Sequence, residues 1–471
     1  MAAFRTKKLS FEENYVRMSE TPVPRLVGSL AVPTIITMLV TTFYNMADTV
    51  FVSWLGTQAS GAVGIVFSLM SIIQAIGMTL GMGAGNYIAR LLGAKENQRA
   101  NQVLGTTFVL ALAIGGVLTL FGLIFLQPFM KLLGSSETIL PYASDYGGII
   151  LIGAPIMAAT FVMNVSLRSE GSASLGMIGM VTGALLNVAL DPLLIFTFKM
   201  GIKGAAVATV FSQAVSFVIL LSFYLRKKSV VRLSTKCFRF EASIYKEVFV
   251  TGMPAFYRQG MASVSMIILN IVARPFGDAA LAAMAIVART MQFLGSALIG
   301  FGQGFQPVAG FSWGAKKYDR LMEAFYFSLK VGVIGFLIIG AIGFSFAPTI
   351  MRFFIKTDLE VVKIGSLAMR LQSLMMPLQA VNIIISMFFQ SIGKPRQASL
   401  TALTRQGLFF IPTILVMGKT IGVLGIQLSQ PISDLFTFIL SVAMMFYFFK
   451  KSNILSLVDE ISHKDASAVV Q

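Results

Sequence analysis

Two carboxylic acids lie inside apolar segments of the first half of the sequence, where a charge is costly. Asp48 falls well within the apolar stretch Ala31–Leu55, and Asp191 falls between the apolar runs of Leu185–Phe198. A carboxylate at the centre of a membrane helix costs about 2.5–3.5 kcal/mol on insertion scales. A side chain kept at that cost is a candidate for function, because a buried carboxylate can bind a cation or exchange a proton.

Neutral oxygen ligands accompany both acids at helical spacing. Asn187 stands four residues before Asp191, and Asn45 stands three before Asp48, so each pair shares one helix face. Thr209 adds a hydroxyl from the next apolar segment. Carboxylate, amide and hydroxyl oxygens are hard ligands that suit a small cation such as Na⁺. The alternative is a hydrogen-bond lock between helices. Two buried acids exceed what a lock requires, so we favour a cation or proton site at Asp48, Asn187, Asp191 and Thr209, with Asn45 as an additional ligand.

Asp434 is a third acid within an apolar segment, this time near the end of the chain. It follows Gln430 and Pro431 in the last apolar segment. It could face a transport cavity as an additional ion site, or it could pair with an arginine that also lies in the membrane. We favour the pairing, for which the second half offers four candidates: Arg258, Arg289, Arg370 and Arg405.

The composition indicates a polytopic membrane protein and excludes several kinds of chemistry. Hydrophobic residues make up 56% of the 471 residues, and charged residues only 12%, against about 25% in soluble domains. The single histidine, His463, lies in the polar tail, and the single cysteine, Cys237, lies in a basic loop. Catalysis by Ser-His or Cys-His pairs and His/Cys metal sites within the membrane are therefore excluded. The net charge of +17 indicates cytoplasmic loops beside anionic lipid, and no nucleic-acid partner.

Twelve apolar segments are long enough to cross a bilayer as helices. The basic loops follow the even-numbered segments, which places both termini in the cytoplasm. The expected spans are 25–55, 60–90, 100–128, 140–167, 174–198, 203–226, 244–274, 279–312, 319–348, 361–390, 397–418 and 423–449.

An internal repeat divides the spans into two sets of six. Gly93-Ala94-Lys95 recurs 221 residues later at Gly314, and the same offset relates Pro33 to Pro254. Six spans return the chain to the same side, so the halves should be related by an axis along the membrane normal. Asp48 maps onto Leu269, so the acidic cluster belongs to the first half alone. The expected parts are a cytoplasmic N-terminal segment 1–24, an N-lobe 25–226, a basic linker 227–243, a C-lobe 244–450 and a cytoplasmic tail 451–471.

The sequence resembles the multidrug and toxic compound extrusion (MATE) transporters over roughly residues 20–450. The resemblance rests on Tyr44 to Thr49, on Gly93-Ala94-Lys95, on Asn187 to Pro192 and on Gly201 to Thr209. It implies cation-coupled export, with a Na⁺ or proton site at Asp48, Asn187, Asp191 and Thr209, and a bending point at Pro33. The NorM-type branch has acids in the seventh and tenth helices that this chain lacks, so the chain looks closer to the branch that couples through the first lobe.

The expected function is secondary active efflux of organic cations and amphipathic drugs by a monomer in the cell membrane. Na⁺ or H⁺ would serve as coupling ion, and no cofactor is expected. A flippase for lipid-linked oligosaccharide or peptidoglycan precursors is the alternative, because that class belongs to the same superfamily and the second-half arginines suit a pyrophosphate. The paired acids favour cationic cargo instead. A membrane enzyme would need a cluster of catalytic residues at one membrane face, and the sequence has none.

Overall fold

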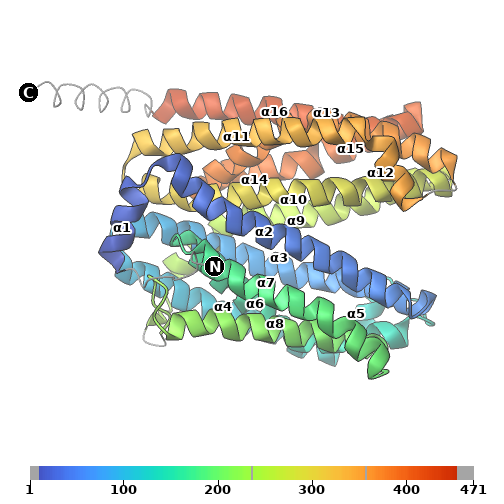
Figure 1. The fold of residues 1–471 in the computed structure, drawn as a ribbon, viewed down its shortest axis with the longest axis horizontal. Helices are drawn as coiled ribbons and strands as arrows, with labels where there is room; N and C mark the ends of the chain where they lie inside the picture. Colours follow the sequence, from blue (N-terminus) through green and yellow to red (C-terminus); the bar gives the residue numbers. More distant parts are fainter. Residues whose placement is uncertain (1–9, 235–236, 356–357, 453–471) are drawn as a thin grey trace, which may run out of the picture. The chain divides into compact units, whose positions relative to one another are not determined.

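The protein is built from α-helices along nearly its whole length. A computed structural model describes residues 10–234, 237–355 and 358–452, and their helices appear in Figure 1. The first half contains α1 (Phe11–Glu20), α2 (Val23–Ser53), α3 (Thr57–Gly93), α4 (Asn97–Ile124), α5 (Leu126–Leu132), α6 (Leu140–Ser169), α7 (Ala173–Pro192), the π-helix η2 (Leu193–Thr197) and α8 (Ile202–Leu225).

The second half repeats the order from α2 onward, and it adds a 3₁₀ turn after its first long helix and a further helix after its π-helix. It contains α9 (Ala242–Ala273), the 3₁₀ turn η4 (Arg274–Phe276), α10 (Asp278–Gly314), α11 (Tyr318–Ser345), α12 (Ala347–Phe354), α13 (Leu359–Ser391), α14 (Pro395–Leu403), the π-helix η5 (Thr404–Leu408), α15 (Phe410–Ile421) and α16 (Val423–Ser452).

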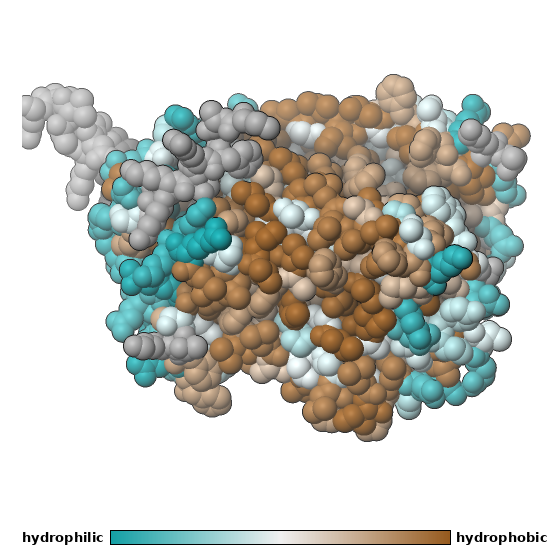
Figure 2. All heavy atoms as spheres, turned by 60° about the horizontal axis from the view of Figure 1, so that its bottom comes forward, coloured by the Kyte–Doolittle hydropathy of each residue, from teal (hydrophilic) through white to brown (hydrophobic). Residues whose placement is uncertain are grey.

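Twelve long helical segments correspond to the twelve expected spans, which confirms the all-α polytopic fold. Among the described residues, eleven segments meet the length and composition of a membrane span. The twelfth is α9, a helix of 32 residues that carries Lys246, Glu247 and Arg258. The α14–η5–α15 series forms the single span Pro395–Ile421. Figure 2 shows the consequence at the surface, where apolar side chains cover the middle of the drawn face.

The backbone reproduces the repeat at its turns. Gly56 and its partner Gly277 precede α3 and α10 with φ of 110° and 90°. Gly201 and its partner Gly422 precede α8 and α16 with φ of 56° and 65°. Glycine adopts these positive φ values without the steric cost that a side chain would impose. The recurrence of glycine in the sequence therefore reflects two copies of the same turns.

Two compact units are present, each organised around one buried helix. In the first unit α6 packs against α3, α4 and α8, and in the second unit α13 packs against α10, α11 and α16. The first unit comprises residues up to Thr21 together with Val32–Phe256, and the second comprises Pro22–Ala31 and Tyr257 onward. The lobes expected from the sequence end at the linker instead, so the units differ from them by the exchange of two helix ends.

Repeat-related glycines explain this exchange of helix ends. A methyl group at Gly83 of α3 would lie 1.9 Å from the backbone oxygen of Val248 in α9. A methyl group at Gly304 of α10, 221 residues later, would lie 2.4 Å from the Cα atom of Ala31 in α2. Only glycine permits such a close approach of two helix backbones. The start of α9 thus packs within the first unit, and the start of α2 packs within the second.

Glu170, in the turn between α6 and α7, connects three segments of the first unit. Its side chain is only 1% exposed, and its Oε2 atom accepts hydrogen bonds from Ser229 Oγ (2.7 Å) and Val231 N (2.9 Å) in the linker. Its backbone oxygen accepts from Asn14 Nδ2 of α1 at 3.0 Å. Burial raises the pKa of this carboxyl to about 7, and the hydrogen bonds oppose that rise. Helix α1, which the sequence did not predict, is thereby attached to the linker.

Candidate cation site

Helices α7 and α8 bring together three of the four residues expected to bind the coupling ion. Asn187 Nδ2 donates to Asp191 Oδ1 at 3.3 Å, and the same nitrogen approaches Thr209 Oγ1 at 3.4 Å. Asp191 is fully buried, and the side chains of Asn187 and Thr209 are only 2% and 3% exposed. The amide therefore links the carboxylate on its own helix to the hydroxyl on the next one.

Close approach of α7 and α8 follows from two glycines and one proline. A methyl group at Gly183, one turn before Asn187, would lie 1.8 Å from Ser216 Oγ of α8. A methyl group at Gly204 would lie 2.8 Å from the carbonyl carbon of Leu194 in η2. Pro192 ends α7 directly after Asp191, and the π-helix η2 follows it. Such π-turns occur preferentially at functional sites.

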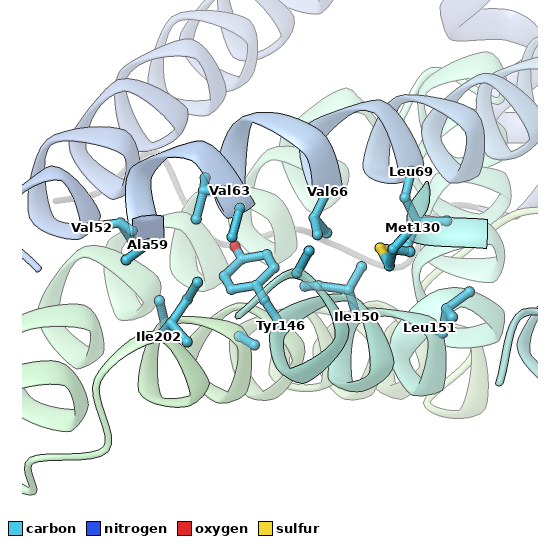
Figure 3. Packing of buried hydrophobic residues seen from close by; sticks show 14 of the residues in the cluster. Val52, Ala59, Val63, Val66, Leu69, Met130, Tyr146, Ile150, Leu151 and Ile202 are labelled. Carbon is cyan, nitrogen blue, oxygen red and sulfur yellow. The ribbon is translucent and has the colours of Figure 1, made fainter. Parts of the chain in front are cut away.

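Asp48 of α2 completes the cluster beside Tyr146 of α6. Asp48 is 8% exposed and lies within electrostatic reach of Asp191 and of the Tyr146 hydroxyl. Figure 3 shows the Tyr146 ring in the apolar core near Ile150, with its hydroxyl directed toward Val63. The two acids of the first half therefore occupy one site, although α2 and α7 are far apart in the sequence.

Several polar atoms of this cluster have unused bonding capacity. Asp48 Oδ1, Asn187 Oδ1 and Asp191 Oδ2 are buried, and none has a hydrogen-bond partner within the described part of the chain. The Tyr146 hydroxyl lies within hydrogen-bonding reach of Asp48 and Thr209. Buried acceptors without partners are uncommon in folded proteins and call for an explanation. Three oxygens from two acids and an amide are the donor set that a hard cation or a proton would satisfy.

A small cavity adjoins this cluster. Its volume is about 10 Å³, which is room for roughly one water molecule. Asn187 and Thr209 line it together with Tyr44 and Gln213. The cavity has room for an ion or a water molecule beside Asn187, whereas a drug-sized molecule could not fit.

The two other first-half candidates, Asn45 and Pro33, lie on the same helix as Asp48. Asn45 is half-buried, and its recorded bond is through its backbone oxygen, which accepts from Thr49 Oγ1 at 2.9 Å. Pro33 is buried within α2, where its backbone oxygen accepts from Thr37 Oγ1 at 2.8 Å. It lies two residues beyond Ala31, where α2 passes from the second unit to the first. Its position suits a bending point, and its role stays a prediction.

Asp434 forms a separate polar cluster in the second unit. Its carboxylate is fully buried and accepts from Arg405 Nε at 2.7 Å, from Gln379 Nε2 at 2.7 Å and from Gln430 Nε2 at 3.2 Å. Of the four arginines considered as partners, Arg405 is the one that pairs with it. The guanidinium neutralises the acid, and the amides use its remaining acceptor capacity. Both carboxylate oxygens of Asp434 therefore have hydrogen-bond partners, whereas Asp48 and Asp191 each have one oxygen without a partner among the described residues.

The sequence did not single out Tyr146 or Gln213. Tyr146 sits in an apolar helix, where a tyrosine is normally a core residue, and neither position carries a charge that is costly in the membrane. Tyr44 had a local signal, because it stands four residues before Asp48 on the same helix face.

Comparison with sequence families gives one match that spans the repeat. The sequence model of the family described as MatE matches residues 33–193 and again residues 254–416. The multidrug export protein MepA of Staphylococcus saprophyticus is 26% identical over 405 residues, covering 86% of this chain and 89% of that protein. The protein of the same name from Staphylococcus aureus strain MSSA476 is 25% identical over 425 residues, covering 90% and 93%.

Solved structures with the same architecture are also found. A MATE structure in complex with MaL6 superposes with a TM-score of 0.88 at 25% identity, covering 94% of this chain and 99% of that one. A MOP superfamily transporter from Pyrococcus furiosus, reported to have a binding pocket of reversed polarity, gives 0.87 at 26% identity, covering 93% and 98%. An outward-facing multidrug resistance MATE transporter gives 0.87 at 25% identity, covering 94% and 98%.

Proposed function

The chain belongs to the MatE family of membrane transporters, and from this premise we propose that it exports amphipathic organic cations in exchange for Na⁺ or H⁺. It is a multi-pass membrane protein and not an enzyme. The relatives named multidrug export protein MepA support a cargo range of several drugs. Coupling would take place at Asp48, Asn187, Asp191 and Thr209.

One observation carries the proposal of an ion site in the first unit. Three buried oxygens, from Asp48, Asn187 and Asp191, have no hydrogen-bond partner among the described residues. Leaving a buried polar atom unsatisfied costs about 1–3 kcal/mol, and more when the group is charged. A Na⁺ ion or a proton would remove that cost, so the cluster should take up one or the other when the site is accessible.

Antiport follows if cargo and coupling ion depend on the same charges. The ionised carboxylates of Asp48 and Asp191 attract a cationic drug, and a bound Na⁺ or proton neutralises that attraction. Each ligand then lowers the affinity for the other, and this negative coupling is reciprocal. The small cavity beside Asn187 has room for the ion but not for the drug, so the two would compete through the charge of the acids and not for the same space.

Efflux from everted membrane vesicles tests this function. A fluorescent organic cation is followed while Na⁺ and H⁺ gradients are imposed separately. We expect Asp48→Asn and Asp191→Asn to abolish gradient-driven transport, because each keeps size and polarity but removes the charge. Asp145→Asn is the matched control, since that acid lies partly exposed on α6 beside Lys203. Normal efflux by the Asp48 and Asp191 variants would contradict the proposal.

Substitution of the neutral ligands is a second, independent test of the ion site. Asn187→Ala and Thr209→Ala should raise the cation concentration needed for half-maximal transport while drug affinity changes little, because they remove oxygens but not charge. If Na⁺ and pH dependence stayed unchanged in both variants, the ion site would have to be placed elsewhere.

The flippase alternative has less support. It needs a cationic pocket for pyrophosphate, and Arg405 is neutralised by Asp434. Arg370 is exposed and donates to the backbone oxygen of Phe344 at 3.3 Å. Reconstituted vesicles with a labelled lipid-linked sugar would separate the two functions, because only the flippase would move that lipid without a cation gradient.

A further inference from the structure

A cavity of about 580 Å³ lies in the second unit, between the start of α14 and the last turns of α16. It is distinct from the Asp434 cluster. Its lining combines basic and polar residues from both helices with apolar residues from α16. This volume falls within the usual size of small-molecule and lipid pockets.

One part of the cavity is built to attract an anion. Lys394 is the N-cap residue of α14, whose first backbone N–H groups receive no side-chain cap, and Gln397 lies one turn further on. Lys451 lines the cavity from α16, and Ser452 Oγ is buried there without a partner among the described residues. No carboxylate of the described residues lies within 4 Å of either lysine. Free amide groups, a helix dipole and two ammonium groups together suit a phosphate.

The remaining wall is apolar. Met444, Tyr447 and Phe448 of α16 line it. Phe448 is fixed by aromatic contacts with Phe388 and Phe389, at ring-centroid distances of 6.0 and 5.6 Å. Tyr447 is 66% exposed, and Lys451 lies 5.8 Å above its ring. Because α16 is a membrane span, this wall continues the surface that faces acyl chains, so a ligand here has an apolar part beside its anion.

The repeat shows what the cavity lacks. With the offset of 222 residues that relates Gly171 to Gly393, Lys394 corresponds to Ser172, which neighbours the buried Glu170. In the first unit Ser229 donates to the buried carboxylate of Glu170, so the chain supplies the anion itself. In the second unit Ile392 takes the position of Glu170, and Lys394 takes the position of Ser172. The positive charge therefore remains without an anion from the described chain.

We propose that this cavity binds an anionic phospholipid. Its phosphate lies at the start of α14 between Lys394 and Lys451, where Ser452 and the free N–H groups of α14 complete its hydrogen bonds. One acyl chain lies along Met444, Tyr447 and Phe448. A free phosphate would use the lysines but leave the apolar wall exposed, so the lipid is the ligand that matches both parts.

Native mass spectrometry of the purified full-length protein with added lipid tests the proposal. Phosphatidylglycerol should bind more tightly than phosphatidylcholine. Each lysine near an anionic headgroup is worth about fivefold in affinity, so Lys394→Gln combined with Lys451→Gln should weaken phosphatidylglycerol binding about 30-fold. Lys450→Gln is the matched control, because it removes a neighbouring exposed charge that does not line the cavity, and it should change affinity less than twofold.

Three results would overturn the assignment. The first is unchanged lipid affinity in the double variant, and the second is equal binding of phosphatidylcholine. The third is displacement of the lipid by inorganic phosphate at equal concentration, which would identify a phosphate site instead. A variant that ends at Ser452 should keep the lipid preference, and its loss would show that the tail forms the site. Because none of these variants touches the first-unit acids, failure here is distinguishable from failure of the proposed transport function.

Discussion

Replacing a buried aspartate by asparagine should lower the stability of the protein in the second unit and leave it nearly unchanged in the first. Asp434→Asn removes the carboxylate that accepts from Arg405 at 2.7 Å and leaves that guanidinium unpaired. Removing one partner of a buried ion pair costs about 3–5 kcal/mol. The Arg405 side chain is 26% exposed, so water recovers part of this loss and we expect the lower end, about 3 kcal/mol.

Asp191→Asn should cost little stability. Asp191 has no cationic partner among the described residues, one of its oxygens is orphaned, and it lies within electrostatic reach of Asp48. An amide of the same size removes the like-charge repulsion and keeps the bond from Asn187. We therefore expect a change within about 0.5 kcal/mol, or a gain. The same variant should lose coupled transport, which separates function from stability at this position.

Thermal unfolding in detergent, followed by circular dichroism, measures the contrast. An unfolding entropy of about 2.1 cal/mol/K per residue over 471 residues corresponds to about 1 kcal/mol per degree. Asp434→Asn should thus lower the midpoint by about 3 °C, and Asp191→Asn should leave it within about 1 °C. Adding Arg405→Gln to Asp434→Asn should restore most of the loss. An equal fall for both single variants, or none for Asp434→Asn, would refute the assignment of one acid to structure and the other to coupling.

Three further predictions concern the backbone and the loops. Pro33→Ala should reduce transport per folded molecule far more than Pro254→Ala, because only Pro33 precedes an acid on its helix; equal losses in vesicle efflux would end its role in coupling. Gly83→Ala should destabilise the protein by about 1–3 kcal/mol in thermal unfolding, because the methyl group would lie 1.9 Å from a backbone oxygen of α9. Gly116→Ala, with open space around it, should be neutral or stabilising, and the reverse order would contradict the packing argument. The carboxyl pKa of Glu170 is raised to about 7 from 4.5 by burial, so wild-type stability relative to Glu170→Gln should be greatest below about pH 4.5 and decline as the pH rises through 7. A difference between these two proteins that stayed constant from pH 5 to 8 would show that this carboxyl does not titrate there.

Spans and repeat could be read from the sequence because the bilayer imposes one pattern along the whole chain. Apolar length identified the membrane segments, and paired glycines such as Gly56 and Gly277 identified equivalent turns, since positive φ demands glycine in both copies. Helix α1 could also have been found, because Ser10 and Glu13 form a capping box with bonds of 3.1 and 2.7 Å. That signal is local and lies outside the apolar pattern on which the spans were predicted.

The site was predictable only where burial of a polar group is costly. Asp48 and Asp191 could be found because a carboxylate in an apolar helix is costly, which indicates a functional role. The position of Tyr146 beside them depends on how α6 packs against α3, which no local pattern encodes. The π-turn of η5 likewise depends on tertiary contacts. The backbone carbonyls of Arg405 and Gln406 accept hydrogen bonds from the hydroxyls of Ser433 and Ser265 on other helices.

Because the helix ends are exchanged, the two halves of this protein cannot be swapped between related transporters without breaking native contacts. The first residues of α2 belong to the second unit, and the start of α9 belongs to the first, with the changes at Ala31 and Phe256. A chimera joined at the basic linker would therefore pair each lobe with a foreign helix end, at the glycines where backbones approach most closely. Junctions placed at both changeover points would keep every close backbone contact native. Among related transporters, substitutions in the start of α2 should accordingly be correlated with substitutions in the second unit, and those in the start of α9 with substitutions in the first unit.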